Sequence, residues 1–121
     1  MKSLDQLRAA HVWKRLEDSR VNDDYVNLTK GAPALIMSNG LMQTLAFLKS
    51  KDKEHHKRLL GDISSWLADE NSGVGMCNSN FNSIMNWLHN SKSEEFMRAT
   101  EETLEYLRWL RQYASAVKSG G

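Results

Sequence analysis

The sequence predicts an all-α fold, a single compact bundle of five to six helices. Apolar residues recur at three- and four-residue spacing along most of the chain, and no segment alternates apolar and polar residues over the length of a strand. A chain of 121 residues suits one domain that buries roughly two-thirds of the surface of the unfolded chain. We therefore expect residues 1–121 to form one domain, with residues 118–121 as a disordered tail.

The first predicted helix covers residues 3–20. Ser3 suits its N-terminal cap. The face expected in the core carries Ala9, Val12, Trp13 and Leu16. Asn22 then begins a polar segment that either interrupts the helical pattern or caps a short second helix.

Residues 33–48 are the densest apolar segment and the expected centre of the bundle. Pro33 suits the first turn of a helix, because its missing N–H would have no partner there anyway. Three leucines follow at helical spacing: Leu41, Leu45 and Leu48. Asn39 and Gly40 tolerate a left-handed backbone, so they either separate two helices or mark a tight bend.

Residues 49–58 concentrate charge, with five cations and two anions. A solvated connection explains such a segment most simply, and a phosphate-contacting patch is the alternative. A helix then continues to about Asp69, and the Gly-, Asn- and Ser-rich residues 70–80 are the clearest loop. A further short helix follows this loop from Phe81.

The last helix, at about residues 93–117, is the longest. Ser91 and Glu94 fit a capping box before it. Its expected buried stripe consists of Phe96, Ala99, Thr103, Leu104, Leu107, Leu110, Ala114 and Val117. Glu102 falls on the outer face, where Arg98 is its expected partner. Tyr106, Trp109 and Tyr113 fall on one flank and are candidate subunit contacts.

Charge and cysteine content exclude several classes. Sixteen Lys and Arg against 15 Asp and Glu leave a net charge of +1, which argues against holding nucleic acid by bulk charge. One cysteine excludes an internal disulfide and suits a reducing compartment. No apolar segment approaches the roughly 18 residues that a membrane helix needs. We expect a cytoplasmic protein without membrane contact.

We expect no metal site, no cofactor and no enzymatic activity. His55 and His56 are adjacent, so their rings diverge on a helix, and Cys77 has no CxxC partner. As a nucleophile, Cys77 would need a positioned base, and nothing in the sequence orients His89 toward it.

Three blocks of sequence carry a resemblance that covers most of residues 25–117. They are Tyr25 with Lys30, Pro33, Ile36, Asn39-Gly40-Leu41 and Leu45-Ala46-Phe47; Trp66-Leu67; and residues 96–102 with Trp109-Leu110-Arg111 and Ala114. In this order they resemble the small helical subunit of the Cmr effector complex, the type III-B CRISPR–Cas machine. The chain departs from the family at Phe96, where Tyr is common, and in its loop at residues 70–80.

The resemblance implies a non-catalytic part in antiviral defence. Several copies would stack into a minor filament beside other Cmr subunits and help hold the duplex of CRISPR RNA and target RNA. The candidate RNA-binding cations form two groups, Lys49, Lys51, Lys57 and Arg58, and Arg98, Arg108 and Arg111. The competing interpretation is a helical adaptor that binds only protein, and copurified RNA would distinguish the two.

Overall fold

The computed structural model describes residues 1–18 and 20–120, and within them every regular element is helical. The side chains of residues 119 and 120 lie outside this description. The elements are α1 (Leu4–Glu17), α2 (Asp23–Asn39), α3 (Leu41–Ser50), α4 (Glu54–Leu67), a 3₁₀ turn η1 (Glu70–Ser72), α5 (Phe81–Asn90) and α6 (Ser93–Gly120). The prediction of an all-α bundle of five to six helices is confirmed.

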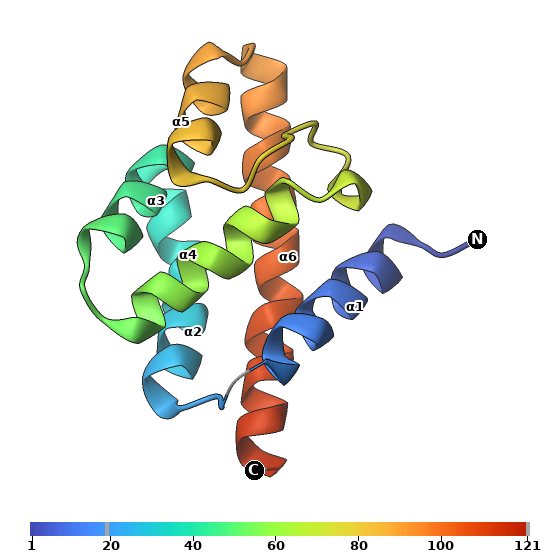
Figure 1. Ribbon diagram of the computed structural model, residues 1–121, viewed down its shortest axis with the longest axis vertical. Helices are drawn as coiled ribbons and strands as arrows, with labels where there is room; N and C mark the ends of the chain where they lie inside the picture. Colours follow the sequence, from blue (N-terminus) through green and yellow to red (C-terminus); the bar gives the residue numbers. More distant parts are fainter. Residues whose placement is uncertain (19, 121) are drawn as a thin grey trace.

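Helix α6 is the axis of the molecule. Figure 1 shows it running the full height of the bundle, with α1 on one side, α2 on the other and α4 crossing in front. All three helices pack against α6, and α4 also contacts α1, α2 and α3. The bundle is therefore built around its last helix, whereas the sequence predicts its centre at residues 33–48.

Helix α2 begins at Asp23, as one of the two alternatives for Asn22 predicts, but it continues through Pro33 to Asn39 instead of ending as a short helix. Asn22 caps it, because its Oδ1 accepts a hydrogen bond from the Tyr25 backbone N at 2.9 Å. Pro33 lies inside the helix, where a proline normally costs about 3 kcal/mol. Ala32 and Ile36 beside it are buried, so tertiary packing holds the helix together. The prediction that Pro33 starts a helix is wrong.

Gly40 separates α2 from α3. Its φ of 86° lies in the left-handed region that favours glycine. Its N–H donates to the Ile36 carbonyl at 2.8 Å, and α3 begins at the next residue. Of the two alternatives for Asn39 and Gly40, two helices with a break between them is confirmed.

The N-terminal ends of α1 and α6 are capped differently. Ser3 and Gln6 form a reciprocal capping box at the start of α1, as Ser3 predicts. At α6 the predicted pair of Ser91 and Glu94 is wrong. Ser91 ends α5, where its hydroxyl donates to the Leu88 carbonyl, and Glu95 instead accepts from the Lys92 backbone N at 2.9 Å.

The C-terminal end of α6 continues where the sequence predicts a tail. The helix extends to Gly120, and Gly121 lies outside the described residues. Lys118 Nζ forms an ion pair with Asp23 Oδ1 at 2.6 Å, which ties this end of α6 to the start of α2.

Candidate functional site

Tyr106 lies inside the bundle, on the flank of α6 that α1 and α4 cover. Its side chain is 0% exposed and stacks on Trp66 with ring centroids 5.4 Å apart. Its hydroxyl lies 2.7 Å from His11 Nδ1. Burial raises the pKa of the Tyr106 phenol, so the hydroxyl keeps its proton. The prediction that Tyr106 belongs to a subunit contact on the surface is wrong.

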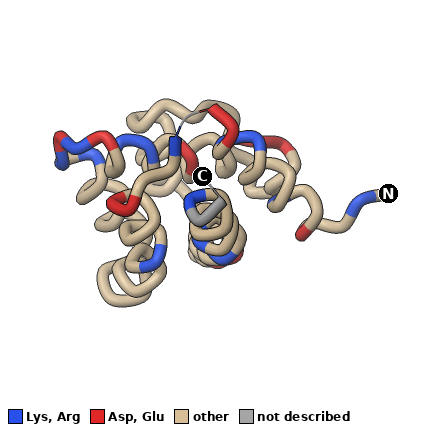
Figure 2. The backbone as a smooth tube through the Cα atoms, turned by 90° about the horizontal axis from the view of Figure 1, so that it is seen from below, with Lys and Arg blue, Asp and Glu red and all other residues tan. Residues whose placement is uncertain are grey.

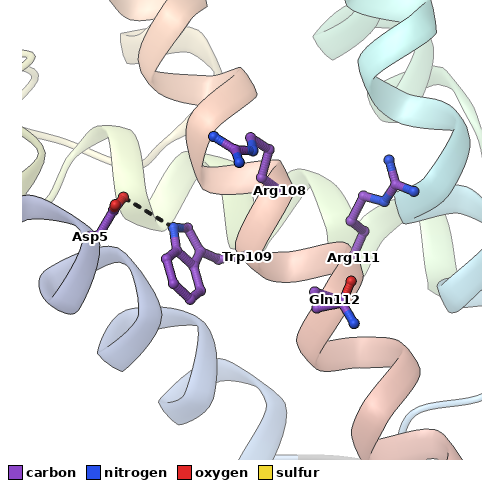
Figure 3. Close-up of a pocket in the computed structure, with 5 residues that line it drawn as sticks. All are labelled: Asp5, Arg108, Trp109, Arg111 and Gln112. Carbon is purple, nitrogen blue, oxygen red and sulfur yellow. Dashed lines mark hydrogen bonds between the residues drawn. The ribbon is translucent and has the colours of Figure 1, made fainter.

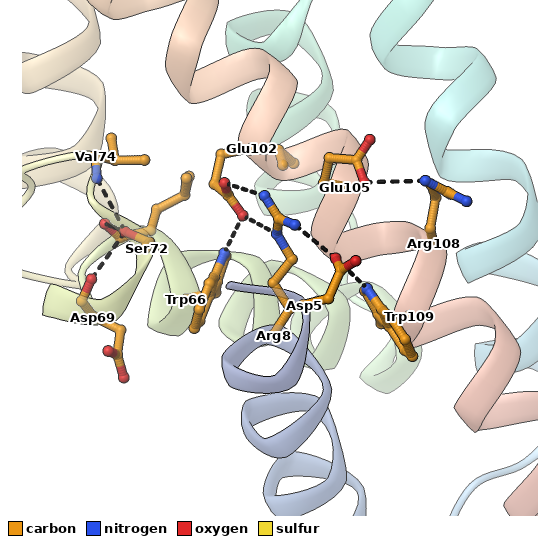
Figure 4. A network of polar contacts seen from close by, with 12 residues as sticks. Asp5, Arg8, Trp66, Asp69, Ser72, Val74, Glu102, Glu105, Arg108 and Trp109 are labelled. Atoms are coloured by element: carbon orange, nitrogen blue, oxygen red, sulfur yellow. Dashed lines mark hydrogen bonds and ion pairs between the residues drawn. The ribbon is translucent and has the colours of Figure 1, made fainter. Parts of the chain in front are cut away.

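Glu102, one turn before Tyr106, is also buried. It accepts two hydrogen bonds from the Arg8 guanidinium, from Nε and Nη2, both at 2.7 Å (Figure 4). Trp66 Nε1 donates to the same carboxylate at 2.9 Å. The hydrogen bonds from Arg8 to Glu102 raise the pKa of Arg8, so the guanidinium stays charged. The predicted pairing of Glu102 with Arg98 is wrong.

A second buried carboxylate, Asp62 of α4, joins two other helices. It accepts from Arg15 Nε of α1 at 2.7 Å and from the Tyr25 hydroxyl of α2. Burial and the negative charge of Asp62 raise the pKa of Tyr25, so its hydroxyl remains a donor. Asp62 is not among the residues predicted to be functional, although its place between Leu59 and Trp66 on the apolar face of α4 marks it as a buried charge.

The first group of candidate cations surrounds the connection between α3 and α4. Lys and Arg alternate there with Asp and Glu (Figure 2). Lys51 Nζ lies 5.1 Å from the Phe47 ring centroid, and Lys57 Nζ contacts Asp52 at 3.3 Å. The Arg58 guanidinium lies over the Tyr25 ring and donates to the Arg20 carbonyl at 2.8 Å.

Within this group, Lys49 and Lys57 come together in one groove. Lys57 also borders a second groove with Arg58, on the side of α4 that faces α2. Lys51 lines neither of these two grooves.

The second group of candidate cations divides between two places on α6. Arg98 packs over the loop before α5, since a Cβ built at Gly73 would come 2.9 Å from Arg98 Nη2. Arg108 and Arg111 instead border an open pocket of about 310 Å³ with Trp109 (Figure 3). Arg108 also pairs with Glu105 at 3.1 Å.

Trp109 is half-buried against α1. Its Nε1 donates to Asp5 Oδ1 at 3.2 Å, and its ring meets Tyr113 edge-on with centroids 5.8 Å apart. Tyr113 in turn meets Trp13 edge-on at 5.9 Å. Trp13 is 51% exposed, so its predicted place in the core is wrong. Trp13, Tyr113 and Trp109 form a continuous strip of rings, which we call the α1–α6 aromatic strip.

Residues 1–18 and 20–120 contain no group of three or more His, Cys, Asp or Glu that could hold a metal ion. In the same part of the chain, none of the helices combines the length and the apolar character that crossing a membrane requires.

Comparison with known proteins agrees with the resemblance that the sequence carries. The "CRISPR system Cmr subunit Cmr5" of Thermus thermophilus is 22% identical over 120 residues, 97% of each chain. The crystal structure of a CRISPR-associated Cmr5 family protein from Thermus thermophilus has the same fold, with a TM-score of 0.78 at 23% identity over 96% of this chain and 97% of that one. The profile of the family described as "CRISPR-associated protein (Cas_Cmr5)" matches residues 4–117. The chain belongs to the Cas_Cmr5 family of CRISPR-associated proteins.

Proposed function

We propose that this chain is a non-catalytic subunit of a CRISPR Cmr effector complex, in which copies of it stack and support the duplex of CRISPR RNA and target RNA. The observation that carries the proposal is the family match over residues 4–117, nearly the whole chain. A relative that matches over 97% of its own length is named as a Cmr subunit. The contact with RNA, the stacking of copies and the lack of catalysis go beyond this match.

The buried polar side chains support a structural role. Arg8 and Glu102 satisfy one another, and Asp62 is held by Arg15 and Tyr25. Each of these groups is used to join helices. Groups that act in catalysis instead face a cleft where a substrate can reach them.

The outer cations support contact with RNA. Lys49 and Lys51 are exposed on a chain whose net charge is only +1. Cations bind phosphates without reading bases, so a subunit of this kind would add affinity without sequence preference. A modest local charge suits a protein that meets RNA inside a larger assembly.

The α1–α6 aromatic strip supports contact between protein subunits. Trp, Tyr and Arg are the residues most enriched at energetically important interface positions. The strip supplies Trp and Tyr, and Arg108 and Arg111 lie beside it at the Trp109 pocket. We assign this surface to a neighbouring copy or another Cmr subunit.

The test is coexpression of the tagged chain with the neighbouring Cmr subunits and a guide RNA. We expect it to copurify with both the subunits and the RNA. Reversing the charges of Lys49, Lys51 and Lys57 should reduce RNA retention, most strongly at low salt. Copurification with proteins but no crosslink to RNA would favour the adaptor, and failure to join the complex would contradict the proposal.

A further inference from the structure

One groove of the molecule combines cations from three different helices. It runs along α4, and we call it the α4 groove. It is lined by Arg15, Leu48, Lys49, Lys57, Leu60, Gly61, Ser64, Ser65, Ser79 and Phe81. Its volume is about 450 Å³, and residues far apart in the sequence form it, from α1 to the start of α5.

The charge of the α4 groove is positive. Arg15, Lys49 and Lys57 line it, and its lining residues within the described chain include no Asp or Glu. Asp62 offsets part of the charge of Arg15 through their ion pair, but it is only 1% exposed, so an anion in the groove would meet the guanidinium and not the carboxylate. Lys57 contacts Asp52 at 3.3 Å and Glu54 at 4.0 Å, and exposed pairs of this kind are each worth only about 0–1 kcal/mol, so an incoming anion can displace them.

Arg15 is held in place before any ligand arrives. Its Nε is fixed by the buried Asp62 at 2.7 Å. Its Nη2 lies against Gly61, where a Cβ would come within 3.3 Å. Glycine inside a helix costs about 1 kcal/mol relative to alanine, and here it lets the guanidinium lie close to α4. A preorganised guanidinium of this kind suits phosphate recognition.

The remaining lining groups fit a sugar–phosphate chain. Ser79 is exposed at the edge of the groove, and Ser65 Oγ lies 3.1 Å from His11 Nε2. Hydroxyl groups commonly contact phosphate oxygens and sugars beside Arg and Lys. Phe81 offers a half-buried ring, with Lys49 Nζ 5.7 Å from its centroid, and rings of this kind stack on bases or riboses.

We infer that the α4 groove binds the phosphate backbone of one RNA strand, with Arg15, Lys49 and Lys57 as the phosphate contacts. The inference rests on the proposed function, and it places the RNA contact of that function on one face of the molecule. It adds Arg15, which the candidate cation groups leave out, and it needs no RNA contact from Arg98, Arg108 or Arg111.

The experiment uses the assembled Cmr complex with guide and target RNA. The photo-crosslinking amino acid p-benzoyl-phenylalanine replaces Ser79 at the edge of the groove or, as the control, Ser38 on the exposed part of α2. We expect RNA crosslinks from position 79 and none from position 38. The double change Lys49→Glu and Lys57→Glu should abolish them, while Lys30→Glu on α2 should not.

The contribution of Arg15 is tested in a double variant, because removing Arg15 alone would leave the buried Asp62 carboxylate without its cation. The double change Arg15→Gln and Asp62→Asn removes both charges and replaces each side chain with a neutral polar one. We expect this variant to assemble and to lose crosslinking at position 79, together with about 0.7 of the logarithmic salt slope of RNA binding. If it fails to assemble, the double change Lys49→Glu and Lys57→Glu decides whether the groove binds RNA.

The outcomes separate the inference from the proposed function. A third variant carries the crosslinking amino acid in place of Arg111 on α6. RNA crosslinks from position 111 but not from position 79 would overturn the groove and leave the proposed function standing. Crosslinks from position 79 to a protein subunit would overturn it as well. If the chain never enters a complex that contains RNA, the proposed function fails first.

Discussion

Helix α6 contains the same pattern twice, a glutamate followed four residues later by an aromatic residue. Glu102 and Tyr106 are the first pair, and Glu105 and Trp109 are the second. The first pair is buried, with Glu102 bound twice by Arg8. The second pair faces outward, where Glu105 meets Arg108 in an exposed ion pair. Two pairs of similar chemistry therefore have different roles.

The difference comes from the neighbouring helices. Moving three residues along a helix rotates the side chain by about 60° around the axis. That rotation takes the first pair under Arg8 of α1 and Trp66 of α4, and it leaves the second pair at the margin of α1. A flank of a helix is thus core or surface according to what covers it, and residue type alone does not decide between the two.

The largest effect should come from Glu102→Ala. It leaves the Arg8 guanidinium buried without its main partner, and breaking a buried pair costs about 3–5 kcal/mol. Urea denaturation of the purified chain measures this loss in the free energy of unfolding.

Glu105→Ala is the matched control. Its pair with Arg108 is exposed, so we expect a loss of about 0–1 kcal/mol. Equal losses for the two substitutions would show that the two pairs do not differ as the structure indicates.

Tyr106→Phe tests the polar part of the buried pair. The ring and its stacking on Trp66 remain, but the hydrogen-bond partner of His11 Nδ1 is removed. Leaving a buried polar group unpaired costs about 1–3 kcal/mol, measured again by urea denaturation. Tyr113→Phe, on the partly exposed side, should have a smaller effect, and a reversed order would contradict the assignment.

His11 should make stability depend on pH. Burial lowers the pKa of His11 below the value of about 6.5 that the unfolded chain retains, so the native state prefers the neutral ring. Between the two pKa values the unfolded chain binds the extra proton. Stability is therefore complete above the unfolded pKa and is lost as pH falls toward the folded pKa.

Melting midpoints at about pH 7.5 and about pH 5.5, on either side of the unfolded pKa, check this direction. We expect the midpoint to drop at the lower pH and the drop to shrink in His11→Gln. His56 also has a pKa lowered by burial, so some dependence should persist in this variant. An identical drop in the two proteins would exclude His11 as its source.

Local chemistry explains which parts of this comparison could be predicted from the sequence. The caps at Ser3 and Asn22 act within one helical turn, so their sequence signals are sufficient. The pairing of Glu102 with Arg8 joins residues 94 positions apart, and no local pattern specifies it. Helical spacing places Tyr106 on a flank but does not reveal that α1 and α4 cover that flank.

The same limit applies to the candidate surfaces. The charged residues 49–58 are visible in the sequence as a possible phosphate site, but Arg15 of the α4 groove is brought to Lys49 only by folding. The sequence misplaces Trp13 and Pro33 because the packing of whole helices outweighs local spacing and local backbone preference.

Trp109→Ala should have a small effect on the folding of the isolated chain and a large one on assembly. Trp109 is half-buried, and the hydrogen bond from its Nε1 goes to the exposed Asp5, so truncation should cost about 1 kcal/mol. If the α1–α6 aromatic strip contacts another subunit, the same truncation removes a large part of that contact while the chain stays folded. Incorporation into the reconstituted Cmr complex, measured beside the urea midpoint, separates the two effects. Trp13→Ala, at the other end of the strip, should reproduce the assembly defect. A loss of stability as large as that of Glu102→Ala would place Trp109 in the core and withdraw the interface.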